Sequence, residues 1–546
     1  LDPVLEELRE LIRDPGYVRD LVRTRLLENS HRVRLTMVPD TELSARREKA
    51  EAQRLAKIKQ GMEQRQRLEV VKLAGELARR QEEADDPALL PKVGLEDIPA
   101  EMHIASGDAG ELCGRPASFY AQGTNGLVYQ QVVADLPDLD DELLETLPYY
   151  TNALTQLGCA GRDYLDVQAL QTSVSGGVHA SSSMRGSVED VQRMSGYFVL
   201  SGKALVRNHG ALSALMRDSL LEARFDESAR IREIMAQQRA RREQSVTGNG
   251  HGLAMLAAMS GLSSGAALSH RLRGLAGIRH LKVLDDALDS ENELDQLAGR
   301  FEKIHQQIVA APRQFLLVAE AERLSQACEE VQQAWTGSED NVSAFSAFSP
   351  APVNRQVCDA WLTNTQVNFC AKAYPTVPAE HEDAAALSVL AGFLRNGYLH
   401  RVVREQGGAY GGGASHDSDN AAFRFFSYRD PRLEETLDDF DKSVAWLLDD
   451  KHEWRLVEEA ILGVIGSIDR PGSPAGEAKD AFFSNLYGRT PERRQAFRQR
   501  VLGVTLADLQ RVGETYLRPE AASVAVISAP AEEQRCRDLG LTIQML

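Results

Sequence analysis

Residues 123–136, GTNGLVYQQVVADL, and residues 363–377, TNTQVNFCAKAYPTV, are the two stretches that decide the fold class of this chain. In each stretch apolar and polar residues alternate, which predicts a half-buried strand. A helical pattern follows each strand, to about Leu157 in the first block and from about Glu382 to Arg404 in the second. Each block then continues with mixed strand and helix patterns. A duplicated α+β domain, with an antiparallel sheet and helices packed on it, is the simplest explanation.

The remaining segments flank or join these blocks. Residues 1–42 show a helical pattern that ends in the alternating stretch HRVRLTMVPD, which we interpret as the last helix and strand of a preceding domain. The next residues are dense in Lys, Arg, Glu and Gln with spaced Leu and Val, which predicts a helical hairpin with polar outer faces. The alternative, a free-standing coiled coil, is disfavoured because no heptad repeat persists. The expected organisation is a terminal remnant at 1–42, a helical connector at 43–93, an α+β domain at 94–336, a polar linker at 337–351 and a second α+β domain at 352–546.

The composition argues against several classes of protein. The formal net charge is −18, from 62 basic and 80 acidic residues, which disfavours nucleic acid as a partner. No apolar run approaches the ~18 residues of a membrane span, so we expect no membrane partner. The sequence shows no secretory signal pattern, and its six cysteines lack C-x-x-C spacing. We expect reduced thiols in the cytoplasm, or in a mitochondrial or plastid matrix in a eukaryotic cell.

The twelve histidines form no metal-binding pattern. None belongs to an H-x-x-E-H, H-E-x-x-H or H-x-x-x-H sequence, so we predict that this chain alone forms no metal site. Residues 416–420 offer oxygen ligands but lack the glycine and glutamate of a calcium loop, and a polar hairpin turn is expected there. The serine-rich run at 175–183 is predicted to be a strand, because it lacks the strand-turn-helix context of a catalytic serine.

The segment VVREQGGAYGGG, residues 402–413, combines an Arg, a Tyr and five glycines after a helical pattern. A phosphate-binding loop would follow a strand and contain Lys, so that interpretation fails. On an unbroken α-helix Arg404 and Tyr410 would point about 120° apart. If Gly407 and Gly408 end the helix, the guanidinium and the phenol can converge and hold the carbonyl oxygens of an extended peptide. The alternative is a helix cap with Tyr410 packed inside and Arg404 in an ion pair.

At these residues the sequence resembles a known family. YLHRVVREQGGAYGGG and FRFFSYRDP are similar to the C-terminal half of the pitrilysin/insulinase-type zinc metallopeptidases, specifically the presequence-protease branch. The resemblance extends to LLENSHRVRLTMVPD, LEDIP, TNGLVYQQVVADLPDL and SVTGNGHGLAMLAAMSGLS. It implies four related α+β domains around a closed peptide chamber, with a helical hairpin between the halves. Residues 94–336 would then be a third, inactive domain, and residues 352–546 a fourth.

The resemblance also implies where the chemistry resides. The family's zinc is held by H-x-x-E-H and a distal Glu in the N-terminal half, so the complete enzyme would contain zinc and this chain would bind none. In the helix equivalent to the zinc helix, Tyr149, Asn152 and Ala153 stand where His, Glu and His would fall. Arg404 and Tyr410, with Gly407 and Gly408, are similar to the residues that reach the substrate. Tyr410 would donate to the oxyanion formed when zinc-bound water attacks, while Arg404 holds the peptide.

Two functions follow from these observations. The first is the C-terminal half of a zinc metalloendopeptidase that degrades unstructured peptides, including basic ones attracted by the acidic balance. Its partner would be the N-terminal catalytic half, in the same polypeptide or in a separate chain, and this chain alone would be inactive. The alternative is a non-catalytic partner or scaffold subunit of the same superfamily. Retention of both Arg404 and Tyr410 favours the first, because a scaffold does not need the pair.

Overall fold

The computed structural model describes residues 2–38, 40, 42–82, 89, 91–337, 345–449 and 451–546. The chain divides into two compact units, Leu1–Lys92 and Val93–Leu546. Part of the predicted connector (83–88 and 90) and part of the predicted linker (338–344) lie outside the described residues. No helix in the described ranges is both long enough and apolar enough to cross a membrane.

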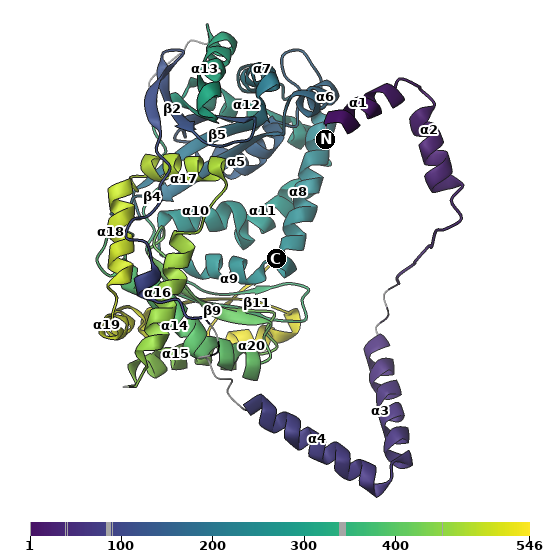
Figure 1. The fold of residues 1–546 in the computed structure, drawn as a ribbon, viewed down its shortest axis with the longest axis vertical. Helices are drawn as coiled ribbons and strands as arrows, with labels where there is room; N and C mark the ends of the chain where they lie inside the picture. The colour runs from purple at the N-terminus through teal and green to yellow at the C-terminus, as the bar shows by residue number, and fades with distance from the viewer. Residues whose placement is uncertain are drawn as a thin grey trace. The chain divides into compact units, whose positions relative to one another are not determined.

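The first unit is helical (Figure 1). Its elements are α1 (Asp2–Leu11), α2 (Tyr17–Val22), the π-helix η1 (Arg23–Leu27), α3 (Leu43–Gly61) and α4 (Gln64–Glu82). The last two have 19 residues each and are separated by the extended backbone at Met62. Residues 31–38 carry no strand, contrary to the prediction, and Val33 is 92% exposed. A strand needs a hydrogen-bonded neighbour, and the described residues of this unit contain no other strand.

The second unit contains two six-stranded sheets (Figure 1). The first has the order β1-β2-β6-β3-β5-β4 and the second the order β12-β7-β11-β8-β10-β9. The strands of the first sheet are β1 (Asp108–Leu112), β2 (Arg115–Ala121), β3 (Leu127–Asp135), β4 (Val178–Gly186), β5 (Met194–Leu205) and β6 (Arg313–Ala319). Those of the second are β7 (Cys358–Leu362), β8 (Phe369–Pro375), β9 (Gly411–Asp417), β10 (Ala422–Tyr428), β11 (Ser523–Ser528) and β12 (Thr542–Met545).

Five strands of each sheet repeat one topology. The series β2-β6-β3-β5-β4 and β7-β11-β8-β10-β9 run through the same order, and in both only the first pair is parallel. The sixth strand differs, because β1 is antiparallel to β2 whereas β12 is parallel to β7. The predicted duplication and α+β class are confirmed. The sheets are mixed rather than purely antiparallel, since the last strand of each repeat enters beside the first.

Helices fill the connections between strands. The first block contains α5 (Asp141–Leu154), α6 (Tyr164–Val174), α7 (His209–Leu221), α8 (Ser228–Gly248), α9 (Gly250–Met259), α10 (Ser264–Arg273), α11 (Leu275–Ala287), α12 (Glu291–Ala310) and α13 (Ala321–Trp335). The second contains α14 (Ala384–Leu394), the π-helix η5 (Arg395–Gln406), α15 (Glu434–Leu448), α16 (Trp454–Ile468), α17 (Pro474–Leu486), α18 (Pro491–Leu502), α19 (Leu506–Tyr516) and α20 (Glu533–Asp538). Short 3-10 turns lie at Leu95–Asp97, Val206–Asn208, Pro519–Ala521 and Pro530–Glu532.

Local sequence explains where several helices begin. Asp140 accepts a hydrogen bond from the Leu143 N–H at the start of α5, and Asp163 caps α6 in the same way. Ser473 and Thr490 cap α17 and α18, and in both helices a proline follows the cap. These side chains satisfy N–H groups that have no partner inside the helix.

Each sheet is covered by a helix of the other block. On the first sheet Val132 faces the helices of its own block, whereas Val133 packs against Ala478 and Phe482 of α17. On the second sheet the face opposite α14 packs against α9. Both sheets are therefore buried on two faces, and not on one as expected. The two blocks form one compact unit, and the predicted boundaries between them stay predictions.

Small residues allow α9 to approach the second sheet closely. The sheet face beneath it carries four alanines, Ala371, Ala373, Ala422 and Ala525, and α9 contributes three more. A Cβ atom added at Gly250 would lie 2.7 Å from the ring of Phe369. The contact is therefore as tight as a core interior, and it holds the two blocks in one relative position.

Phe482 tests this reciprocal packing, because it lies on α17 but covers the sheet of the other block and is only 5% exposed. We predict that Phe482→Ala lowers the free energy of unfolding by about 3–5 kcal/mol through lost burial and a residual cavity. Hydrogen exchange should show faster exchange in β5 and in β10 together. As a control, Trp454→Ala, at a residue 50% exposed, should change stability by about 0.5 kcal/mol or less. Faster exchange confined to β10 would contradict the coupling.

Candidate functional site

Arg404 lies near the end of η5, which continues α14 directly. We expected an α-helix here, but the Gly407 N–H donates to the carbonyl of Val402, five residues earlier, at 2.9 Å. This is the π-helical pattern, and the angle calculated for an α-helix does not apply to it. The helix nevertheless ends at Gly407, as predicted. Gly408 then reverses the chain with a φ of 81°.

Tyr410 directly precedes β9, an edge strand of the second sheet. Its N–H donates to the carbonyl of Tyr428 at 3.0 Å, and the two rings meet edge to face with centroids 5.6 Å apart. Tyr428 packs in turn against His251 of α9, with centroids 4.8 Å apart. Tyr410 is 68% exposed, so its backbone is held by a hydrogen bond while most of its side chain is accessible to solvent. The alternative in which Tyr410 packs inside a helix cap is therefore wrong.

Arg404 is also exposed to solvent. Its Nη1 lies 3.3 Å from Nε2 of His400, one turn earlier. None of the ion pairs formed by the described residues involves Arg404, so its charge is not used by the fold. No hydrogen bond joins Arg404 to Tyr410 in the described part of the chain. The convergence of the two side chains on a bound peptide stays a prediction.

The glycines of the motif pack against other parts of the chain. A Cβ added at Gly407 would collide with the guanidinium of Arg432, which pairs with Asp439 at 3.0 Å. A Cβ at Gly412 would lie 2.6 Å from the side chain of Val403, where β9 crosses η5. Glycine is therefore required at positions 407 and 412 for η5, β9 and the Arg432 side chain to pack together. A role for Gly407 and Gly408 in binding substrate stays a prediction.

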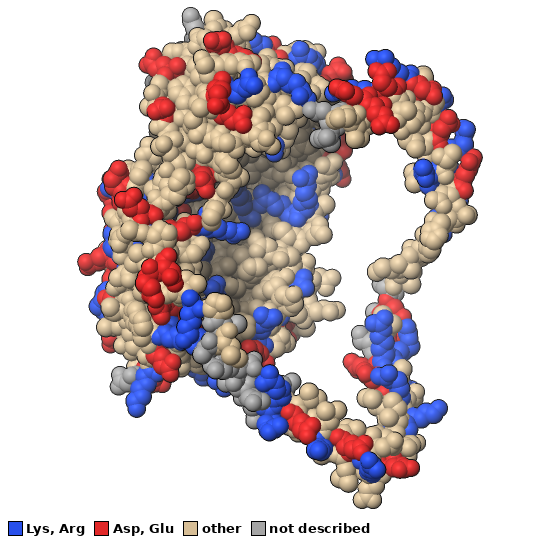
Figure 2. All heavy atoms as spheres, in the orientation of Figure 1, with Lys and Arg blue, Asp and Glu red and all other residues tan. Residues whose placement is uncertain are grey.

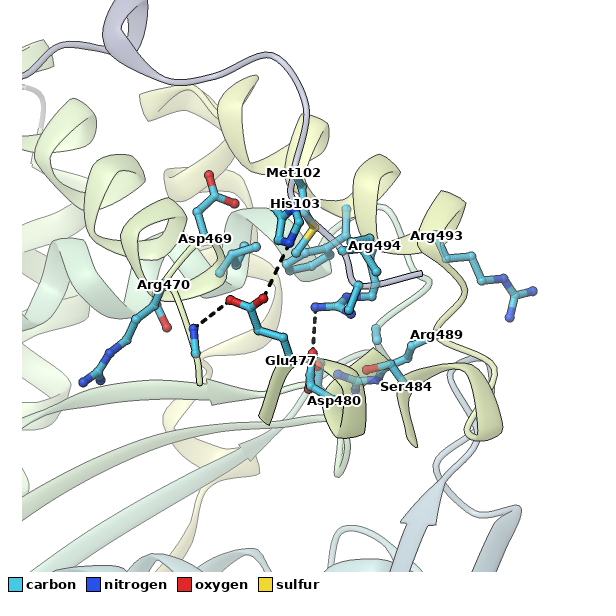
Figure 3. Close-up of a pocket in the computed structure, with 18 of the residues that line it drawn as sticks. Met102, His103, Asp469, Arg470, Glu477, Asp480, Ser484, Arg489, Arg493 and Arg494 are labelled. Atoms are coloured by element: carbon cyan, nitrogen blue, oxygen red, sulfur yellow. Dashed lines mark hydrogen bonds and ion pairs between the residues drawn. The ribbon is translucent and has the colours of Figure 1, made fainter. Parts of the chain in front are cut away.

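A cavity of about 940 Å³ lies elsewhere in the second unit (Figure 3). It is lined by the segment around His103, the loop that follows α16, and residues of α17 and α18. Most of its charges pair with each other: His103 lies 3.5 Å from Glu477, and Arg494 lies 2.9 Å from Asp480. Neither Arg404 nor Tyr410 lines it. We interpret this cavity as the junction between blocks, because most of its charged side chains already have partners.

A smaller cavity of about 370 Å³ lies between α5, β4, α8 and the end of α10. Three arginines line it, Arg241, Arg242 and Arg273, together with Gln238 and Asn152. The sequence did not predict this site. The run RARRE at 239–243 in a long charged helix is equally typical of a solvent-exposed face, and Arg273 is distant in sequence.

Comparison with known proteins places this geometry in a family. Two family models match: the region associated with peptidases of family M16, group C, over residues 37–284, and "PreP C-terminal domain" over residues 359–528. Presequence protease 1, chloroplastic/mitochondrial, of Arabidopsis thaliana is 28% identical over 93% of this chain and 47% of its own length. The mitochondrial presequence protease of Yarrowia lipolytica is 29% identical over 95% of this chain and 52% of its own. The chain belongs to the presequence-protease branch of the M16 peptidases.

The resemblance inferred from the motifs is therefore confirmed, and the chain corresponds to the C-terminal half of this branch. It spans about half the length of these curated relatives. Solved structures share the fold. A peptidase M16 inactive domain from Pseudomonas fluorescens has a TM-score of 0.55 at 16% identity, covering 78% of this chain and 98% of its own. A protease from Helicobacter pylori has a TM-score of 0.54 at 12% identity, covering 78% and 100%.

The M16 family implies a zinc ion, so the donor set of this chain must be tested against it. In α5, Tyr149 is 2% exposed and Ala153 is fully buried, while Asn152 is half-buried. A phenol inside the core and a methyl group cannot replace two histidine ligands. The described residues contain no group of three or more His, Cys, Asp or Glu side chains that could hold a metal ion. The residues present do not fit zinc, and we derive no step through it on this chain.

Gly408 offers a test of the turn that carries Tyr410. Its φ of 81° is unfavourable for residues with a Cβ, although the nearest heavy atom to an added Cβ is 3.6 Å away. We predict that Gly408→Ala lowers the free energy of unfolding by about 1–2 kcal/mol through backbone strain alone. Urea denaturation would measure this. Gly411→Ala is the matched control, because an added Cβ there meets no heavy atom within 4 Å. Equal effects of the two variants would contradict the role of the left-handed turn.

Proposed function

We propose that this chain is the substrate-contacting half of a zinc metalloendopeptidase that degrades unstructured peptides. The observation that carries the proposal is the state of Tyr410 and Arg404: both are exposed, and both lie where a helix meets an edge strand. Neither is buried in the core, and Arg404 forms no ion pair among the described residues. A fold that needed these residues only for stability would bury or pair them. Zinc and the base Glu would belong to the N-terminal catalytic half.

The two side chains would act on the bound peptide in different ways. The hydroxyl of Tyr410 would donate a hydrogen bond to the scissile carbonyl oxygen as negative charge develops on it. The edge-to-face contact with Tyr428 would restrict the ring before substrate arrives and so reduce the reorganisation needed at the reaction step. Arg404 would bind neighbouring carbonyl oxygens with its planar fork of donors. Gly407 and Gly408 would let the peptide backbone come close to this turn.

The class and location of the substrate are part of the same proposal. Unstructured peptides fit a chamber that must close around its substrate. The net charge of −18 supports attraction of basic peptides at long range. The names of the relatives, which specify mitochondria or chloroplasts, support a mitochondrial or plastid matrix, with the cytoplasm as the expectation for a bacterial protein.

A non-catalytic partner or scaffold subunit is the second candidate. It is supported by the donor set of α5, which does not fit zinc, and by likeness to a structure described as an M16 inactive domain. The two candidates differ in what Tyr410 does. A scaffold would tolerate loss of one exposed hydroxyl without any effect on turnover.

The decisive test is Tyr410→Phe in the complete two-half enzyme. We expect kcat to fall about 10²–10³-fold, because one oxyanion donor is lost in the transition state. Zinc content, measured by atomic absorption, should not change. Tyr398→Phe is the matched control, since it removes a hydroxyl from a half-buried tyrosine of η5 that stacks on Trp446. Wild-type turnover of the Tyr410 variant would refute the catalytic role and favour the scaffold.

A further inference from the structure

The cavity between α5, β4, α8 and α10 is an open pocket with a lining drawn from distant parts of the chain. Four separate elements supply its lining, including Asn152 of α5, Ser181 of β4, Gln238 of α8 and Arg273 at the end of α10. Its volume of about 370 Å³ lies within the range of ligand sites. Figure 2 shows the second unit hollowed over α8, α10 and α11, with Lys and Arg side chains gathered in the hollow.

Three guanidinium groups line this cavity without a counter-charge. Arg242 donates to the carbonyl of Arg273 at 3.1 Å, and Arg273 donates to the carbonyl of Ser182 at 3.1 Å. Arg241 reaches only the side chain and carbonyl of Gln237. None of the three takes part in an ion pair among the described residues, and none of the lining residues is Asp or Glu. Every partner that holds them is a neutral oxygen.

The surroundings make this concentration of positive charge costly. Burial lowers the pKa of Arg242. Burial also lowers the pKa of Arg273, and the nearby charge of Arg242 lowers it further. The Arg273 side chain is nevertheless exposed, because it faces the hollow rather than the core. Like charges held together in a partly desolvated site are stabilised when an anion binds between them.

Gln238 provides an independent observation. Its side chain is only 7% exposed, and its Nε2 has no hydrogen-bond partner among the described residues. A buried amide donor without an acceptor destabilises the protein unless a ligand or solvent satisfies it. A buried neutral donor without a partner therefore lies in the wall of the cavity, beside the charged donors that line it. Only a group rich in acceptors matches this set, and three guanidiniums repel a metal cation.

We propose that this cavity binds an oxyanion, and that the anion is a carboxylate carried by an unstructured peptide. The guanidinium groups would hold the carboxylate, with Gln238 donating one further hydrogen bond. Asn152 and Ser181 would contact the adjoining peptide backbone. The peptide as the source rests on the proposed function, whereas the oxyanion site itself does not. A free phosphate ion has the same chemistry and is the competing source.

Binding to the intact chain tests the proposal without any turnover. A short unstructured peptide with a free C-terminal carboxylate and its C-terminal amide would be compared by fluorescence anisotropy, with inorganic phosphate titrated alone by calorimetry. We expect the amide to bind at least tenfold more weakly, and Arg242→Gln to weaken the acid form about tenfold while leaving the amide unchanged. Arg323→Gln on α13 is the control, with the same change of charge at an exposed arginine outside the cavity.

The variant Gln238→Leu distinguishes a loss of anion binding from a folding defect. Removing a buried donor without a partner should leave the melting temperature unchanged or raise it, while anion binding weakens. A rise in stability together with a loss of binding cannot come from misfolding. Because Tyr410 lies outside this cavity, Tyr410→Phe should retain anion binding even if it changes turnover, so failure of the two proposals can be distinguished.

The possible outcomes distinguish a peptide carboxylate from a free phosphate ion as the ligand of this cavity. Preference for the acid peptide, lost in Arg242→Gln, supports the peptide carboxylate. Equal binding of acid and amide, with phosphate binding that is lost in Arg242→Gln, retains the oxyanion site but overturns the peptide as its ligand. Absence of any anion dependence overturns the proposal. Equal losses in Arg242→Gln and Arg323→Gln overturn it as well, because they would reflect net charge rather than a site.

Discussion

The reciprocal covering of the two sheets is the constraint on which the rest of this structure depends. A sheet with two apolar faces must be covered twice, and each block supplies the second cover of the other: α17 lies on the first sheet and α9 on the second. Neither block could fold alone in this form without exposing an apolar sheet face to water. The duplicated topology therefore does not produce two independent domains. It produces one unit whose halves are related and mutually dependent.

The same packing between blocks positions the turn at residues 407–410, which carries the candidate catalytic residue Tyr410. His251 lies on α9, so the helix that covers the second sheet also places a ring against Tyr428, and Tyr428 supports Tyr410. Burial lowers the pKa of His251, which favours the neutral form of this supporting ring. Gly412 lets β9 pass close to η5 on the other side of the turn. The position of Tyr410 thus depends on packing between blocks as well as on its own glycines.

Much of the fold follows from the sequence, and the exceptions have physical causes. The strands at 127–135 and 369–375 and the break at Gly407 were predictable, because alternation and glycine act locally. Burial of each sheet on both faces was harder to predict from the sequence. In β8 the alternation is weak, and Lys372 is buried in an ion pair with Asp441 at 2.6 Å instead of facing solvent. The π-helix could not be predicted either, since no residue pattern distinguishes it from an α-helix.

The net charge of the chain is negative, whereas the local charge at the small cavity lined by Arg241, Arg242 and Arg273 is positive. The net charge of −18 determines the electrostatic field at long range, whereas the arginines of the small cavity dominate the field at contact distance. The same arrangement bears on how α5 would interact with a metal cation. Asn152 stands at a position where the family resemblance would place a catalytic Glu, and it lines the cavity that contains three guanidiniums. Two separate features therefore oppose a cation there: the ligands are missing, and the local field is positive. The donors that line the cavity instead suit a ligand of the opposite charge.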